Sequence, residues 1–259
     1  MSGSRRSLIL GGLALAGGYA ALRHGPPALR SRLAGLAFVP LERPAGFRRV
    51  AGGAVSAGGF DPFVGLDGSG AAPSVPAASA PDDLCAALFP DWSGAAGVVP
   101  VASFSDYNCA ICRITTRRLA GLGAVADGTA QVTWHELPIL GETSVLAARA
   151  ALAADRQGAY AAFHERLLRS PFQPTPAYLD ALAEDLGLDR DRLAADMAGE
   201  AVTGRIARSL ALRRLFSFAG TPAIVVGRTV VEGDVDETTL ARLVEAEREA
   251  GPRLECAGA

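Results

Sequence analysis

The sequence predicts an α/β domain, and three features of its apolar runs carry that prediction. A strand-like run at 98–104 leads directly into a helical pattern. Helical patterns then fill the interval from 145 to about 216, and two short β-branched runs and a final helix follow. A central sheet interrupted by a block of helices has this order of elements. We therefore expect one domain over 97–255, with a helical insertion at about 142–217.

The first strand and helix are predicted around the sequence Cys109-Ala110-Ile111-Cys112. The apolar run before it is typical of a buried strand, and Ile111, Ile114 and Leu122 recur at helical offsets after it. This pattern places Cys109 at the N-terminus of a helix.

The remaining elements are predicted from runs of apolar residues and from residues that begin or end helices. Residues 132–136 form the next predicted strand. Within the helical interval, Thr175 before Pro176 and Asp189 are helix N-caps, and Gly187 and Gly199 are helix stops. The chain then returns to the sheet and ends in a helix, with strands at 223–226 and 230–232 and the helix at 238–249.

The two cysteines at this helix start predict disulfide exchange. Unpaired N–H groups and the helix dipole favour a thiolate there, so we expect the pKa of Cys109 to lie below about 8.5. Cys112 lies one turn inward, where we expect it to be less exposed and to resolve a mixed disulfide on Cys109. The same spacing also occurs as half of a zinc site, but no second ligand pair lies at close spacing, so redox chemistry is favoured over a metal or other cofactor.

Three stretches in family order resemble the DsbA-like branch of the thioredoxin superfamily. They are 104–113 around the cysteines, 135–150, and 220–227. The resemblance implies a thioredoxin-like fold with a helical insertion. It also implies that Pro222 is a cis-proline and that Thr221 faces the disulfide, where its backbone binds an extended substrate.

The sequence departs from the family pattern in two respects. Ala110 and Ile111 stand where relatives often have proline or histidine, which suggests a less strongly oxidising pair. Ser103 stands six residues before the first cysteine, where several relatives have a buried carboxylate, so no proton acceptor for Cys112 is visible.

The chain before the domain is predicted to be a leader and a linker. Arg5 and Arg6 precede an apolar run to Leu22, so residues 1–22 are expected to be an export signal or a membrane anchor. Residues 23–96 are rich in Gly, Ala and Pro and are expected to be linker or poorly ordered chain. Short ordered pieces are expected within it at 47–50 and 60–63.

Other residues are assigned structural roles. Trp134 is expected in the core, His135 on the surface or satisfied, and His164 on the solvated face of a helix. In an oxidising compartment Cys85 and Cys256 would pair across the domain, remain two free and partly buried thiols, or leave Cys256 to form an intermolecular bridge. The net charge of −2 and pI near 6.0 argue against nucleic-acid binding.

These observations predict an exported protein-disulfide oxidoreductase, periplasmic or otherwise extracytoplasmic, either soluble after cleavage or tethered by its N-terminus. Its partners would be reduced substrate proteins, and the resemblance implies a membrane quinone-linked partner that reoxidises it. Three alternatives stay open: a disulfide reductase or isomerase, a non-catalytic thioredoxin-fold module that binds peptides or metal, and a glutathione-dependent enzyme of the same fold. The intact cysteine pair counts against the last of these.

Overall fold

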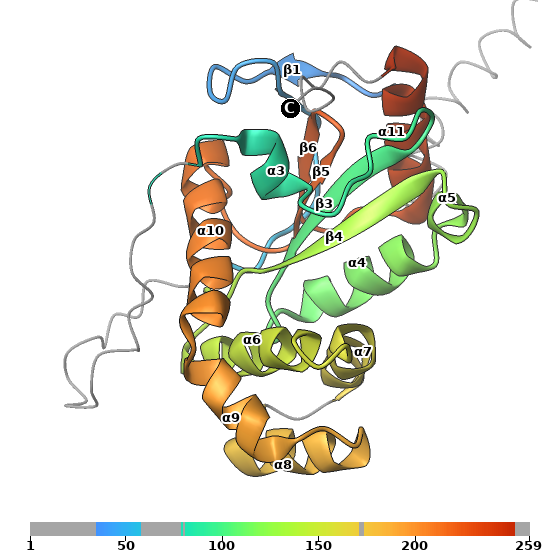
Figure 1. The fold of residues 1–259 in the computed structure, drawn as a ribbon. Helices are drawn as coiled ribbons and strands as arrows, with labels where there is room; N and C mark the ends of the chain where they lie inside the picture. The colour runs from blue at the N-terminus through green and yellow to red at the C-terminus, as the bar shows by residue number, and fades with distance from the viewer. Residues whose placement is uncertain (1–34, 58–78, 80, 171–173, 252–259) are drawn as a thin grey trace, which may run out of the picture.

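A six-stranded mixed sheet forms the centre of the protein (Figure 1). The computed structural model describes residues 35–57, 79, 81–170 and 174–251. The strand order across the sheet is β1-β2-β6-β5-β3-β4. The strands are β1 (Val39–Pro40), β2 (Arg48–Arg49), β3 (Val99–Ser105), β4 (Ala130–Glu136), β5 (Ala223–Val226) and β6 (Thr229–Glu232).

Strand β3 lies at the centre of the core. All seven of its residues are buried, as expected for a strand covered on both faces. It pairs in parallel with β4 and antiparallel with β5, and β5 continues through a turn into antiparallel β6. Near one end of β3, Phe104 pairs with Ala223. This register brings the start of β5 close to the residues that follow β3.

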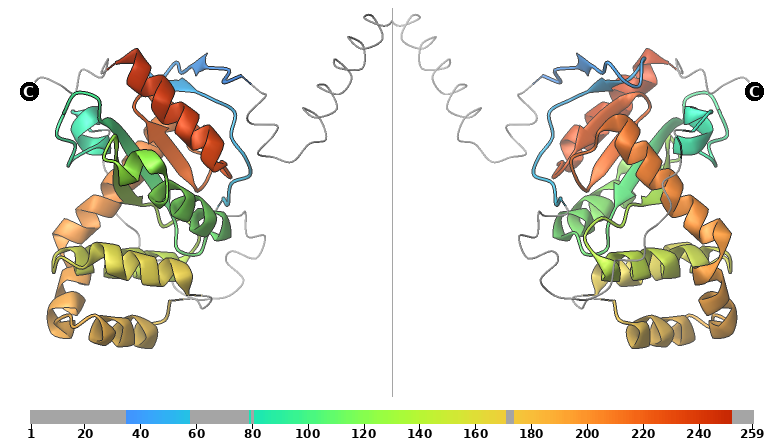
Figure 2. Two further views of the ribbon diagram at one scale, coloured as in Figure 1. Left: turned by 90° about the vertical axis from the view of Figure 1, so that its right-hand side faces the viewer. Right: turned by 90° about the vertical axis from the view of Figure 1, so that its left-hand side faces the viewer.

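Helices cover both faces of the sheet (Figure 2). One face packs against α4 (Ala110–Ala120), α5 (Gly123–Ala126) and α11 (Glu237–Ala250), and the other against α3 (Leu84–Leu88) and α10 (Glu200–Phe216). Successive residues of β5 alternate between them: Ile224 belongs to the first core and Val225 to the second. The predicted order of strands and helices is therefore confirmed.

The helices between β4 and β5 form a separate apolar cluster below the sheet (Figure 1). Thr175 and Asp189 cap helices as expected, because each side chain accepts a hydrogen bond from a backbone N–H three residues on. Tyr107 joins this cluster from the loop after β3. The helices not yet bounded are α6 (Glu142–Asp155), α7 (Tyr160–Arg169), α8 (Pro176–Asp185) and α9 (Arg190–Ala198).

Part of the stretch expected as linker belongs to the sheet. β1 and β2 extend it beyond β6, and α3 packs on the core beside α10. Each strand has only two residues, too few for alternation to show in the sequence. The ordered piece expected at 47–50 is confirmed, since Phe47 and Val50 are buried.

Residues 1–22 and 60–63 lie outside the described chain, and among the described residues no helix is long and apolar enough to span a membrane.

The pairing of the two cysteines outside the central pair remains a prediction. Cys85 lies in α3, and Cys256 lies outside the described residues. Closing a loop of this length would stabilise the fold by about 5 kcal/mol in the chain-entropy model. Non-reducing peptide mapping tests the bridge, and alkylation of both thiols without reductant would contradict it.

His135 is buried and satisfied. Its Nε2 lies 2.8 Å from the carbonyl oxygen of Leu88, and its ring stacks on Phe104. The pKa of His135 is lowered from 6.5 to about 4, chiefly because burial disfavours the charged imidazolium; the Leu88 hydrogen bond opposes this shift, Arg205 and Arg208 add to it, and Glu136 opposes it slightly. The folded protein therefore binds fewer protons than the unfolded chain between these two pH values.

Stability should consequently fall as the pH is lowered from 6.5 to 4, by up to about 3 kcal/mol from this group. Urea denaturation of the wild type and of His135→Gln at pH 7 and pH 4.5 tests this. The variant should lose distinctly less stability between the two pH values. Equal losses would show that His135 does not cause the acid sensitivity.

Candidate redox site

Cys109 lies at the junction of β3 and α4, as predicted. It is the N-cap of α4, and its Sγ accepts a hydrogen bond of 3.0 Å from the backbone N–H of Cys112. The two cysteines form a disulfide, with their Cα atoms 5.2 Å apart. This hydrogen bond and the orientation of the helix both favour negative charge on Cys109 when the disulfide opens.

The expected difference in exposure between the two sulfurs is not found. Cys109 and Cys112 are both fully buried, so Cys109 is not the open thiol that its position at a helix end suggested. The position of Cys109 at a helix end does not by itself determine the exposure of its sulfur, because other parts of the chain, including Thr221, pack against the helix start.

The loop before β5 lies opposite the disulfide. The Thr221–Pro222 peptide bond is cis, as expected from the family resemblance. The carbonyl oxygen of Thr221 lies 3.5 Å from Cys109 Sγ, although 112 residues separate them in sequence. The register of β5 against β3 produces this contact, because Ala223 pairs with Phe104, five residues before Cys109.

The Asp106 carboxylate fixes the loop between β3 and α4. One oxygen accepts hydrogen bonds from the Asn108 N–H (2.8 Å) and from the Ser144 hydroxyl (2.6 Å). The other accepts from the N–H groups of Ile139 and Leu140, at 2.7 and 2.9 Å. Burial raises the pKa of Asp106, and these hydrogen bonds oppose that rise. The carboxylate therefore ties the loop before Cys109 to the start of the helical insertion.

A buried polar cluster lies behind the same loop. The hydroxyls of Tyr107 and Tyr160 each donate a 2.7 Å hydrogen bond to the Glu136 carboxylate. Both hydroxyl protons are used in these bonds, so the Tyr107 oxygen can only accept a hydrogen bond from His164. The Nδ1–H of His164 therefore donates to that oxygen, 2.7 Å away. Burial and the charge of Glu136 raise the pKa of both tyrosines far above 10. His164 was expected on a solvated face and is instead buried, because Tyr107 and Trp134 pack beside it.

Arg113, directly after the cysteine pair, connects α4 to α7. Its guanidinium donates to the carbonyl oxygens of Leu168 and Ser170 at the end of α7, and to that of Tyr107. On the other side of the disulfide loop, Asn108 donates to the Thr143 hydroxyl at 2.7 Å.

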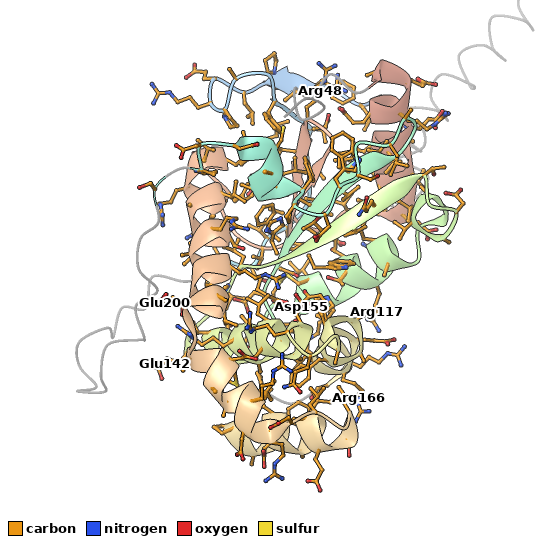
Figure 3. All side chains as sticks on the ribbon, in the orientation of Figure 1. Arg48, Arg117, Glu142, Asp155, Arg166 and Glu200 are labelled. Atoms are coloured by element: carbon orange, nitrogen blue, oxygen red, sulfur yellow. A yellow bond between two sulfur atoms is a disulfide. The ribbon has the colours of Figure 1, made fainter. Side chains whose placement is uncertain are left out.

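A shallow, open hollow of about 310 Å³ lies on the surface of the first turns of α6, where Thr143 is one of its lining residues. Glu142, labelled in Figure 3, lines it.

Sequence reasoning missed Asp106, Glu136 and His164. Only Asp106 carries a local signal, an acidic residue three positions before the helix N-cap; the others depend on tertiary contacts. Ser103 is buried in β3, as its position predicts. In the described part of the chain, no group of three or more His, Cys, Asp or Glu side chains is placed to hold a metal ion.

The sheet with its helical insertion, the disulfide at a helix start and the facing cis-proline loop define a thioredoxin-fold domain with a redox-type cysteine pair. Residues 100–245 match the family model of the DSBA-like thioredoxin domain. The chain belongs to this family.

Several solved structures are similar to this chain. A thioredoxin-like oxidoreductase from Silicibacter pomeroyi is 38% identical, with 63% of this chain and 97% of that chain covered and a TM-score of 0.59. A periplasmic thioredoxin-like protein from Salmonella enterica serovar Typhimurium is 29% identical, with coverages of 63% and 95% and a TM-score of 0.54. The thiol-disulfide exchange protein alpha-DsbA2 from Wolbachia pipientis is 25% identical, with coverages of 57% and 81% and a TM-score of 0.53.

One curated protein is similar over a shorter stretch. The Na⁺/H⁺ antiporter NhaA 3 from Salinispora tropica is 38% identical over 95 residues. These residues are 36% of this chain and 15% of the antiporter, so the chain spans only a small part of that relative's length.

The role of Asp106 predicts a graded loss of stability. Asp106→Ala leaves four donors without their acceptor and should lower the free energy of unfolding by about 3 kcal/mol. Ser144→Ala removes one of the four bonds and should cost about 1 kcal/mol. Urea denaturation measures both. A loss below 1 kcal/mol for Asp106→Ala would contradict the anchoring role.

Proposed function

We propose that this protein is an exported thiol-disulfide oxidoreductase that donates its Cys109–Cys112 disulfide to reduced substrate proteins. One observation carries the proposal most directly: the disulfide caps α4 while the Thr221 carbonyl oxygen lies 3.5 Å from Cys109 Sγ. A substrate backbone beside Thr221 would thus hold its own sulfur close to Cys109. Family membership supports thiol-disulfide chemistry of this kind.

The proposed reaction has two exchange steps. A substrate thiolate attacks Cys109 Sγ, the Cys109–Cys112 bond breaks, and Cys112 leaves as a thiolate. A second substrate thiol, after losing its proton, attacks the substrate sulfur of the mixed disulfide and releases Cys109. The substrate has then lost two electrons and two protons, and the cysteine pair has gained the two electrons. The N–H of Cys112 and the start of α4 stabilise the Cys109 thiolate that is released.

The cellular setting of the proposal rests on the N-terminal sequence. Residues 1–22 would export the chain or tether it to a membrane, and disulfides persist outside the cytoplasm. A membrane quinone-linked partner would then remove the two electrons from the reduced pair, as the family resemblance implies.

Reduction or isomerisation of disulfides is the nearest alternative function. It uses the same residues, and the direction of exchange depends on the redox potential. A difference of about 30 mV, equivalent to about 1.4 kcal/mol for this two-electron couple, changes the equilibrium constant of exchange tenfold. Ala110 and Ile111, which provide no charged or hydrogen-bonding side chain for Cys109, favour this alternative over a very strong oxidase. A non-catalytic peptide- or metal-binding module remains the alternative from another class.

Oxidation of a synthetic dithiol peptide tests the proposed function. The oxidised protein, mixed with an excess of the reduced peptide, should produce peptide disulfide at one equivalent per protein. A reduced protein that instead reduces a disulfide peptide, with no oxidation in the forward assay, would establish the reductase alternative. Stoichiometric metal retained after purification, without turnover in either assay, would establish the binding module.

The assignment of roles to the two cysteines predicts opposite behaviour of two variants. In Cys112→Ser, the Cys109 thiolate attacks a single-cysteine peptide activated as its 2-thiopyridyl disulfide, and thiopyridone leaves; neither Cys112 nor a second peptide thiol is then present to resolve the mixed disulfide, so this adduct should accumulate. Cys109→Ser should form at least about a hundredfold less adduct, because it lacks the nucleophile at the helix start. Mass spectrometry under non-reducing conditions measures the adduct. Accumulation in Cys109→Ser and not in Cys112→Ser would reverse the roles.

A further inference from the structure

The chain before the domain follows the outer edge of the sheet and reaches the redox site. Residues 50–57, called the strap below, continue from β2 along β6, and Figure 2 shows this blue segment descending beside the sheet. Three backbone hydrogen bonds of 2.9–3.0 Å hold its first part to the edge. They join Val50 N–H to Val230, Gly53 N–H to Glu232, and Asp234 N–H to Ala54.

The end of the strap pairs with Thr221. Ser56 N–H donates to the Thr221 carbonyl oxygen at 2.7 Å, and Thr221 N–H donates to the Ser56 carbonyl oxygen at 2.8 Å. The two residues form an antiparallel β-bridge. The Thr221 oxygen in this bridge is the same atom that lies 3.5 Å from Cys109 Sγ. The strap therefore lies beside the sulfur that a substrate must attack.

Glycine residues permit this close approach. A Cβ atom at Gly53 would lie 2.3 Å from the Asp234 carbonyl oxygen, and one at Gly220 would lie 2.4 Å from the Ser56 carbonyl oxygen. Such distances are far below any tolerated contact, so neither position accepts a side chain without displacing the strap. The close contact thus has a glycine in the strap, Gly53, and a glycine in the loop that faces the strap, Gly220.

The paired strap and an incoming client compete for the same backbone groups. Thr221 is fully buried and has a single N–H, which Ser56 occupies. Cys109 also has no exposed surface, so a neighbouring segment must move before a client sulfur can reach it. The strap suits such movement, because Ala54 and Ala57 are exposed and Val55 and Ser56 are only half-buried.

We propose that the strap occupies the position in which an extended client segment pairs with Thr221, and that a client enters by replacing Ser56. The inference rests on the proposed function and adds how a client gains access to the backbone groups of Thr221. Exchange replaces the two strap hydrogen bonds with two client hydrogen bonds, so it leaves no backbone group of Thr221 unpaired. The client thiolate then forms a bond to Cys109 Sγ as the Cys109–Cys112 bond breaks and Cys112 takes the electron pair.

A matched pair of variants at position 56 tests the exchange. Ser56→Pro removes the N–H that bonds Thr221, whereas Ser56→Ala keeps both backbone hydrogen bonds. With the reduced dithiol peptide as substrate, Ser56→Pro should raise the second-order rate of oxidation about tenfold, the size expected for one net hydrogen bond. Ser56→Ala should stay within about twofold of the wild type. An unchanged or lower rate in Ser56→Pro would overturn the proposal.

A binding measurement separates this inference from the proposed function. The same peptide with both cysteines replaced by serine cannot react, and it should bind Ser56→Pro about tenfold more tightly than the wild type. Gly53→Ala, which displaces the strap from the other side, should strengthen binding in the same direction. Equal affinities for all three proteins would overturn the strap exchange. Tighter binding without oxidation by any of them would keep it and refute the oxidase function.

Discussion

Cys109 ends the loop after a strand that is buried on both faces, and it also caps the helix that follows, so its sulfur is held in one place relative to the sheet. The other features of the site depend on that placement. The β3–β5 register determines that the Thr221 carbonyl oxygen meets this sulfur rather than another part of α4. The Asp106 carboxylate keeps the intervening loop in place by accepting hydrogen bonds from both sides of it. The position of the Cys109 sulfur is thus set by the pairing of β3 with β5 and by the buried Asp106 carboxylate.

The helical insertion is joined to the same loop through buried polar groups. Tyr107 lies two residues before Cys109, and its hydroxyl bonds Glu136 at the end of β4 and His164 on α7. Removing one member would leave the others buried and unpaired, which is costly in a low-dielectric interior. The insertion and the sheet therefore both position the cysteine pair, and the strap, whose last residues are half-buried or exposed, lies next to it.

Local patterns in the sequence predicted most of the domain, and long-range contacts account for what they missed. The cysteine pair, the caps at Thr175 and Asp189 and the β5–β6 hairpin all have signals within a few residues of themselves. The strands β1 and β2 have two residues each, and they exist because they pair with β6, far away in sequence. His164 was placed on a solvated face because the helix pattern cannot show that Tyr107 and Trp134 cover it. The contact of Ser56 with Thr221 has no local signal at all.

The direction of exchange depends on the relative stability of the oxidised and reduced pair, to which the N–H of Cys112 and the start of α4 both contribute. Equilibration of the Cys109–Cys112 pair with a glutathione redox buffer measures it most directly. For an oxidase with Ala110 and Ile111 between its cysteines, we expect a potential between about −200 mV and the value of about −120 mV of DsbA. A potential near that of thioredoxin, about −270 mV, would contradict the oxidase function while leaving the fold and the exchange chemistry intact.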